Sequence, residues 1–452
     1  MVRKSIWGVI LTAILMVPGG AQAGGGHGSS ADTNFVVFGP HDIHHPLVAF
    51  HPRGLNLSVP LWMAARVETV NAFPVDAKGN LLETGAAGNF QIRMGVNFDT
   101  GRVLAPFQIA VEYEHDLLTG GVGGHGDLDG EGMPNHHGLE QQIRKAALRA
   151  SLGTFAHIRG GLMTSSWGLG LVANGGDHSW SPGSAAFLDP RGGDRVARLM
   201  LATGPVTPMK LVLAAGHDWV MHDDNTLEGD TARNIFGSFM LGAGLPTNLG
   251  FYAVYRSQEN EAGAWTRVTA LDMYARTQHK LGDEVNLTVE AEAAFIVGNT
   301  TLSPSPEFIE KSVMQVGAAV RGTVDAGWVG GVLDFLYASG DANLDDATQS
   351  AFKPDPNYEQ GIIFYRYVLA GMTGRATATA SNKDVIGYAA QDLERFPTRE
   401  SASNTIAIFP RGFIRPFRGM EVYAGPLVIL GPSAHTDPFN TKIAGGQSRN
   451  AL

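Results

Sequence analysis

Charged side chains recur at every second position in several segments, a spacing that places them on one face of a β-strand. Glu112 and Glu114 form one such pair, and Glu290 and Glu292 form another. Acidic groups that line a water-filled passage can select the ion or solute that passes. They can equally pair with basic groups on neighbouring strands and stabilise the wall. Both interpretations stay open at the level of sequence.

Four arginines complete the set of candidate selectivity residues. Arg149, Arg321, Arg411 and Arg415 lie on the polar faces of well-separated segments. A guanidinium stays charged at any working pH and binds a carboxylate through two parallel hydrogen bonds. We therefore expect these arginines, together with the four glutamates, to line a passage. Because they come from separate strands, one acidic neighbour is not expected to neutralise them all.

Oxygen ligands also gather in the polar stretch 117–138. Asp127, Asp129 and Glu131 are spaced like the start of a calcium loop, although the closing Glu of the full motif is absent. Hard carboxylate oxygens suit Ca²⁺ from the medium. We expect no cofactor apart from a structural calcium ion at these three residues. The alternative is a solvated external loop without a metal.

Motifs for covalent chemistry are missing from the chain. The sequence contains no G-x-S-x-G, no H-E-x-x-H and no Walker loop. It contains no Cys, which excludes disulfides, thiolate metal sites and a Cys nucleophile. We therefore expect a protein that is not an enzyme, with an outer-membrane hydrolase as the weaker alternative.

The elements that would position these side chains are strands with one apolar face. In 286–295, Leu287, Val289, Ala291, Ala293 and Phe295 alternate with polar residues. The same rhythm occurs in 90–98 and 107–114. Strands of about ten residues, apolar on one side and polar on the other, suit a barrel with lipid outside and water inside. The fold class we expect is all-β, a transmembrane antiparallel up-and-down β-barrel of about 16–18 strands.

The first 23 residues predict export. Arg3 and Lys4 precede a mostly apolar run, and Ala21-Gln22-Ala23 gives a cleavage site, so residues 1–23 are expected to be a secretory signal peptide. The whole chain has a net charge of -10. Loss of the two cations leaves 31 basic against 43 acidic residues, a net charge of -12. Such a charge argues against nucleic acid as a partner.

The remaining chain divides into two parts. Residues 24–50 are Gly- and His-rich and are expected to form an N-terminal periplasmic or plug-like segment, with a disordered tail as the alternative. Residues 51–452 are expected to form the barrel. Tight turns alternate there with long polar loops, which is typical of outer-membrane barrels. The strand-like runs are 54–72, 88–98, 104–116, 139–152, 154–165, 193–203, 209–220, 232–243, 247–257, 264–279, 284–297, 309–324, 328–339, 362–370, 403–417 and 419–430.

Two stretches carry a resemblance to known proteins. The run from Asp334 to Asp341, Asp-Phe-Leu-Tyr-Ala-Ser-Gly-Asp, followed by an acidic loop, resembles the late strands of alginate-export-type outer-membrane porins. Trp167-Gly-Leu-Gly170 with Asn174-Gly-Gly-Asp177 resembles uncharacterised outer-membrane barrels of myxobacteria. The first resemblance implies an eighteen-stranded monomeric barrel with an arginine-rich conduit for an anionic polysaccharide. The four glutamates depart from such a cationic lumen.

These patterns together predict a channel in the outer membrane of a Gram-negative cell. We expect passive passage or export of hydrophilic solutes, with anionic saccharides among them, through a monomeric barrel surrounded by outer-membrane lipids. The alternative is a structural or adhesin-like barrel with a plugged lumen and functional external loops.

Overall fold

The computed structural model shows an all-β protein. It describes residues 13–16, 46–50, 54–70, 73–74, 81–82, 85–101, 103–119, 140–175, 193–223, 225–227, 229–282, 284–302, 308–341, 346–355, 358, 360, 403–417 and 420–432. Within these ranges, no helix is long and apolar enough to cross a membrane.

One sheet of 19 strands contains nearly all of the described structure, and a two-stranded hairpin stands apart. Five strands of the sheet have five residues or fewer, and the other fourteen have nine to sixteen. The long strands are β3 (Asn56–Val70), β6 (Gly85–Asp99), β7 (Phe107–Thr119), β8 (Glu140–Leu152), β9 (Ala156–Thr164), β10 (Arg195–Val206), β11 (Leu211–His222), β12 (Thr231–Leu241), β13 (Asn248–Glu259), β14 (Trp265–Lys280), β15 (Asn286–Thr300), β16 (Lys311–Asp325), β17 (Val329–Ala338) and β19 (Thr405–Ile414). The short ones are β1 (Ala13–Met16), β2 (Pro46–Phe50), β18 (Thr348–Gln349), β20 (Val422–Ala424) and β21 (Val428–Leu430), and the hairpin is β4 (Phe73–Pro74) with β5 (Leu81–Leu82).

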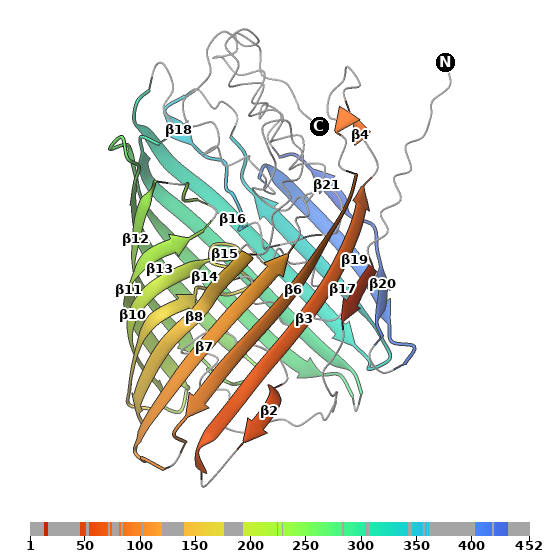
Figure 1. Cartoon of the computed structure of the whole chain (residues 1–452). Helices are drawn as coiled ribbons and strands as arrows, with labels where there is room; N and C mark the ends of the chain where they lie inside the picture. Colours follow the sequence, from red (N-terminus) through yellow and green to blue (C-terminus); the bar gives the residue numbers. More distant parts are fainter. Residues whose placement is uncertain are drawn as a thin grey trace.

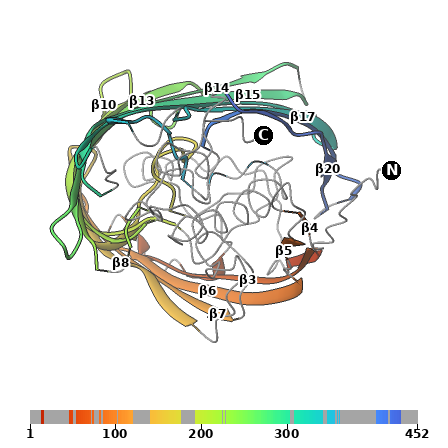
Figure 2. The same ribbon diagram turned by 90° about the horizontal axis from the view of Figure 1, so that it is seen from above.

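Each long strand pairs antiparallel with the next along the chain, from β3 through β17 to β19. The short strand β18 pairs parallel with β16. The tilted strands form a curved wall around a central space (Figures 1 and 2), with β3 near one end of the wall and β20 near the other. Within the described residues, no ladder joins β3 to β19, β20 or β21.

The connections are sorted by length between the two ends of the wall. One end carries the short turns 100–106, 153–155, 207–210, 242–247, 281–285 and 326–328. The other end, called here the loop end, carries one short turn, 260–264, and the longer connections 71–84, 120–139, 165–194, 223–230, 301–310 and the segment between β17 and β19. This is the asymmetry expected from the sequence, and it is characteristic of an outer-membrane barrel.

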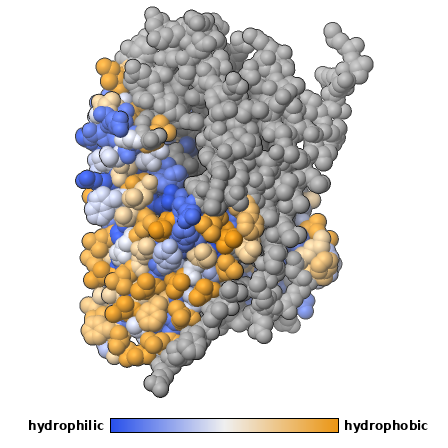
Figure 3. Space-filling model, viewed as in Figure 1, coloured by the Kyte–Doolittle hydropathy of each residue, from blue (hydrophilic) through white to orange (hydrophobic). Residues whose placement is uncertain are grey.

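The two faces of the wall differ in chemistry. On the outer face, alternate apolar side chains are more than half exposed, as in Leu148, Ile158, Leu201, Ile235, Met273 and Leu333. On the inner face, fully buried charged groups such as Asp116, Arg144, Asp272 and Asp334 take the intervening positions. Figure 3 shows hydrophobic residues gathered on the lower part of the described surface and hydrophilic ones nearer the loop end. The wall is therefore built for lipid outside and polar groups inside.

The expected strands are found, with two differences and one untested run. The run 362–370 lies outside the described residues. The run 419–430 is interrupted, because a Cβ at Gly425 would lie 1.9 Å from the carbonyl oxygen of Pro410 and Pro426 has no N–H to donate. It forms only the short strands β20 and β21, both paired with β19. In addition, β1, within the expected signal peptide 1–23, and β2, within 24–50, pair with β3.

Candidate functional site

A cluster of buried charges occupies the inner face of β6, β7 and β8. Arg93 donates two hydrogen bonds to Asp116, of 2.7 and 2.8 Å. Arg144 donates to Glu114 at 3.0 Å and to the carbonyl oxygen of Gly175 at 2.6 Å. Lys145 lies 3.6 Å from Glu114. Three cations thus surround two carboxylates inside the wall, and this arrangement satisfies charges that burial would otherwise penalise.

A β-bulge explains why two consecutive basic residues face inward. The register between β7 and β8 shifts between Glu114 and His115, which pair with Lys145 and Ile143 respectively. Arg144 is therefore the extra residue, and both it and Lys145 are buried. Strict alternation would have placed one of them in lipid, so the bulge re-aims a charged side chain.

A second group of charges lies nearer the short turns. Arg149 pairs with Asp99 at 3.1 Å, and Arg159 pairs with Glu112. Gln108 donates to Asp99 as well. These contacts connect β6, β7, β8 and β9, so the charges hold neighbouring strands together across the inner face.

On the inner face of β16, β17 and β19, two arginines share one carboxylate. Asp334 on β17 accepts from Arg321 on β16 at 2.6 Å and from Arg411 on β19 at 2.5 Å. This sharing could not be predicted from the sequence, because the two arginines are far apart in the chain. In the sheet register, however, Arg321 lies directly opposite Asp334, and Arg411, opposite Val332, is a diagonal neighbour of Asp334. The group carries two positive charges and one negative charge.

The remaining predicted charges also have partners. Arg415, just beyond β19, donates to Asp325 at 2.9 Å and to Glu421 at 3.1 Å. Glu290 accepts from the Tyr274 hydroxyl at 2.7 Å and lies 3.7 Å from Arg276. All eight candidate selectivity residues are thus engaged in ion pairs or hydrogen bonds, and seven of them lie on inner-face positions of long strands.

Glu292 has a different role from the other glutamates. Its carboxylate accepts hydrogen bonds from the backbone N–H groups of Leu169, Gly170 and Leu171, the last two at 3.0 Å. These residues belong to 165–175, the segment that follows β9 and is called here the inserted segment. The indole N–H of Trp167 donates to Asp272 at 3.1 Å. Two carboxylates of β14 and β15 therefore hold the tip of the inserted segment against the inner wall.

A hydrophobic cluster beside Glu292 on the inner wall also fixes this segment. Leu171 and Phe352 are fully buried, together with Ala294, Ala319, Leu336, Ala338 and Ala407 of the wall. The backbone N–H of Asp355 donates to the carbonyl oxygen of Leu171 at 2.9 Å, which joins the inserted segment to residues 351–355. Gly317 makes room for Phe352, because a Cβ there would lie 2.3 Å from the ring. Both segments belong to long connections at the loop end, yet their described residues pack on the inner wall.

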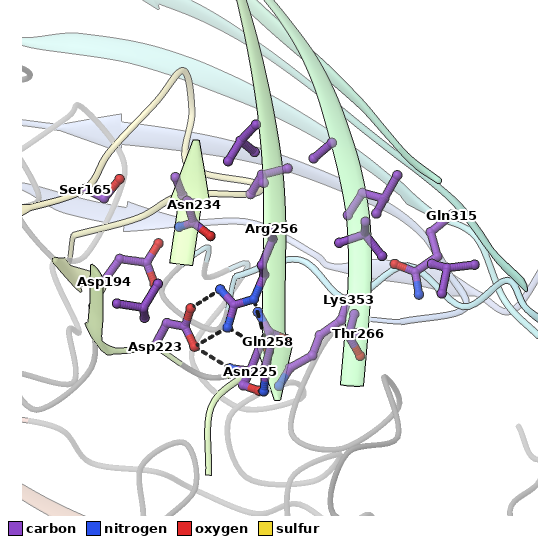
Figure 4. Close-up of a pocket in the computed structure, with 18 of the residues that line it drawn as sticks. Ser165, Asp194, Asp223, Asn225, Asn234, Arg256, Gln258, Thr266, Gln315 and Lys353 are labelled. Carbon is purple, nitrogen blue, oxygen red and sulfur yellow. Dashed lines mark hydrogen bonds and ion pairs between the residues drawn. The ribbon is translucent and has the colours of Figure 1, made fainter. Parts of the chain in front are cut away.

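Between the inserted segment and β10–β16 lies a cavity of about 210 Å³, close to the loop end (Figure 4). We call it the loop-end pocket. Arg256 reaches across it to Asp223, with N–O distances of 2.5 and 3.3 Å, and to Gln258 at 2.8 Å. Burial would raise the pKa of Asp223, but the Arg256 charge and hydrogen bonds from Arg256, Thr226 and Asn225 hold it below the usual value.

Several charged groups of the inner wall were not predicted from the sequence. Arg144 was hidden by the bulge, and the pair of Arg198 with Asp218, at 2.6 and 2.8 Å, was hidden by apolar neighbours on the same face. The calcium candidates Asp127, Asp129 and Glu131 lie outside the described residues. Among the residues that are described, no group of three or more His, Asp or Glu side chains could hold a metal ion.

Comparison with known proteins gives structural likenesses only. No protein-family model and no curated protein matches the sequence. The outer membrane channel DcaP of Acinetobacter baumannii has 12% identity and a TM-score of 0.44, over 85% of this chain and 93% of that one. Acinetobacter baumannii OccAB1 has 10% identity and a TM-score of 0.44, over 89% and 97%. An anion-selective porin from Comamonas acidovorans has 12% identity and a TM-score of 0.26, over 64% and 91%.

The architecture itself defines the environment of the chain. An antiparallel up-and-down wall, with apolar side chains outside and charges inside, belongs in the lipid of an outer membrane. The chain is an outer-membrane protein that crosses the membrane with its strands.

Proposed function

We propose that the protein is an outer-membrane channel for small hydrophilic solutes, with anionic sugar acids among them. It acts by passive diffusion through a wet passage and needs neither covalent chemistry nor a cofactor. We further propose a monomeric barrel and keep a calcium ion at Asp127, Asp129 and Glu131 as a separate expectation.

The observation that carries the anionic preference is the group formed by Arg321, Asp334 and Arg411. One carboxylate cannot neutralise two guanidinium groups. The nearby carboxylate of Glu290, directly opposite Arg321 on β15, lies 3.7 Å from a further arginine, Arg276. Three cations thus meet two carboxylates, and a positive charge remains at this place on the inner wall. The Arg321 side chain is 20% exposed, whereas that of Arg411 is 4% exposed. Arg321 is therefore the group that can offer hydrogen bonds to a passing carboxylate.

Charges elsewhere act more weakly on a solute at this point. The expected mature chain is acidic, but screening over about 8 Å at physiological salt mutes distant charges. Each of the four glutamates already contacts a cation or a hydrogen-bond donor of the wall or the inserted segment: Glu112, Glu114, Glu290 and Glu292. A weak anion preference is the balance of these effects. The finer proposal, export of an acidic polysaccharide, rests on the resemblance of residues 334–341 to alginate-export-type porins.

The runner-up is a structural or adhesin-like barrel with a plugged lumen. The inserted segment and residues 351–355 support it, because both pack on the inner wall and narrow the space inside. The two functions differ in one measurable quantity, the conductance of the purified protein in a planar bilayer.

Ion selectivity in that bilayer tests the proposed function. The wild type should conduct and show a reversal potential of weak anion preference in a salt gradient. Arg411→Ala leaves a balanced pair and should remove the preference, whereas Arg411→Lys should retain it. The double variant Arg321→Ala with Arg411→Ala leaves Asp334 alone and should favour cations. Cation selectivity that none of these changes alters would exclude the arginines from selection, and no conductance at all would favour the plugged barrel.

A further inference from the structure

The loop-end pocket has an aliphatic floor, which the passage of ions does not require. We propose that it is a binding site for a small uncharged amphipathic solute, about the size of one substituted six-membered ring. The inference rests on the proposed function only in placing the pocket on the water-accessible inner side of the wall.

The floor of the pocket is aliphatic. Val196, Val254 and Val313 are buried, and Val220 and Ile296 line the same surface. These side chains occupy inner-face positions, where a water-filled channel normally presents polar groups. An apolar floor gains free energy when a solute replaces the water above it, at roughly 25 cal/mol for each Å² of apolar surface covered.

Polar groups with hydrogen-bonding capacity stand above this floor. The side-chain oxygen of Asn234 is buried and has no hydrogen-bond partner among the described residues. Its amide projects into the pocket, and the amide of Gln315 lies on the other side (Figure 4). A buried acceptor without a donor is costly, and a ligand hydroxyl or amide N–H that reaches the Asn234 oxygen would satisfy it.

The charged groups around the pocket are balanced. Asp194 and Asp223 oppose Arg256 and Lys353. Asp223 already accepts from Arg256, from the backbone N–H of Asn225 and from the Thr226 hydroxyl. Since no net charge faces the ligand and the main ion pair is saturated, a charged solute would lose hydration without gaining a partner. The geometry therefore favours an uncharged polar end, such as a hydroxyl.

Size limits the ligand further. An engineered apolar cavity of about 150 Å³ is known to hold benzene. The loop-end pocket, at about 210 Å³, has room for one such ring with a substituent. Its position between the inserted segment and the strand ends would expose the polar end of the solute to the loop end.

Titration calorimetry on the full-length protein in detergent tests the proposal. Three probes share one phenol ring: 4-hydroxybenzyl alcohol is uncharged, 4-hydroxybenzoate is anionic and tyramine is cationic. We expect the uncharged probe to bind with a stoichiometry of one and at least about tenfold tighter than either charged probe, a difference of about 1.4 kcal/mol.

Variants separate this site from other surfaces. Asn234→Leu removes the amide, and Val268→Phe fills the pocket from its half-buried edge; each should weaken the uncharged probe about tenfold or more. Thr323→Val, on the inner face of β16 near the short turns, should not alter binding. Equal binding in all variants, no binding, or tighter binding of a charged probe would overturn the proposal. If the protein binds the uncharged probe but conducts no ions, the proposed channel is refuted and the binding site stands. If the protein conducts ions but does not bind the probe, the binding site is refuted and the channel stands.

Discussion

Removing the carboxylate of Glu292 should release the tip of the inserted segment. The perturbation is Glu292→Ala, which deletes the acceptor for the backbone N–H groups of Leu169, Gly170 and Leu171. The Glu292 side chain also hydrogen-bonds to the carboxyl group of Asp272, which opposes a full negative charge on Glu292. A hydrogen bond to a neutral acceptor contributes about 0.5–1.5 kcal/mol, and one to a charged acceptor about 1.5–3 kcal/mol. Loss of one should therefore shift the docked population about fivefold, and loss of all three to a fully charged carboxylate, about 5–9 kcal/mol, is the upper limit.

Glu292→Gln gives a graded version of the same experiment. An amide oxygen at the position of Oε2 keeps the acceptor for Leu169 and Gly170. The amide nitrogen at Oε1 would then face the N–H of Leu171, and two donors cannot bond. The Gln variant should therefore lie between the wild type and the Ala variant. Glu290→Gln on the same strand is the matched control, because Glu290 bonds to Tyr274 rather than to the inserted segment.

The absence of cysteine supplies the assay. The sequence contains no Cys, so Ala173→Cys places a single thiol in the inserted segment, at a position that is 7% exposed. Reaction with a water-soluble maleimide should be slow in this background, faster with Glu292→Gln and fastest with Glu292→Ala. Single-channel conductance should rise in the same order. Unchanged labelling and conductance in the Ala variant would refute the view that Glu292 holds the segment.

Three further predictions follow from the wall. Gly317→Ala should displace Phe352 and lower the free energy of unfolding by about 1–3 kcal/mol through overpacking. Gly322→Ala on the same strand is the control, because a Cβ there meets nothing within 4 Å and should leave stability unchanged. Equal effects of the two substitutions would contradict the packing of Phe352 against Gly317. Arg256 holds the pKa of Asp223 below the ordinary value of an aspartate, so the stabilisation should be fully present above the ordinary value and lost as the pH falls through the lowered one. Thermal unfolding of wild type and Asp223→Asn should therefore converge only at acid pH, and convergence near neutrality would refute the pairing. Met273→Arg, on the outer face at mid-strand, should destabilise by about 2–4 kcal/mol in urea unfolding from lipid vesicles, with Met273→Leu as control; a cost no larger than that of the control would argue against lipid contact.

The strands could be predicted from sequence because their two faces have different solvents. In 286–295, apolar and polar residues alternate without a break, and β15 covers the same residues in the structure. The positions of the turns could also be predicted from the sequence, because short connections carry Gly and Asp at the ends of apolar runs. The inner wall at β10 was less predictable. Val196 and Met200 on its inner face are nearly as apolar as Leu199 and Leu201 outside. Trp167 and Val172 of the inserted segment pack on the cluster of Met200, and Val196 packs against Met163 of β9.

Ion pairing between neighbouring strands could be predicted from the sequence, but the partner of each charge could not. Opposite charges on neighbouring strands were one of two open interpretations, and the structure supplies the partners. The register that brings Arg321 and Arg411 to Asp334 depends on β17 lying between β16 and β19. Nothing in the local sequence specifies that a stretch of more than sixty residues separates β17 from β19 while the two strands pair directly. The bulge at Arg144 is likewise a property of the pair β7–β8 rather than of either strand alone.

The inserted segment is held by two contributions of different kinds, and their relative size decides how far it can move. Burial of a Leu side chain such as that of Leu171 stabilises by about 1.5–3 kcal/mol, which is less than the upper limit for the three hydrogen bonds to Glu292. The apolar contribution survives when Glu292 is replaced, so the tip should separate from β15 while Leu171 stays near Phe352. Conductance should then rise only in part with Glu292→Ala, and a larger rise should require Gly317→Ala in the same chain. If the single Glu292 variant already opened the passage fully, the hydrophobic cluster would not be what limits the width of the lumen.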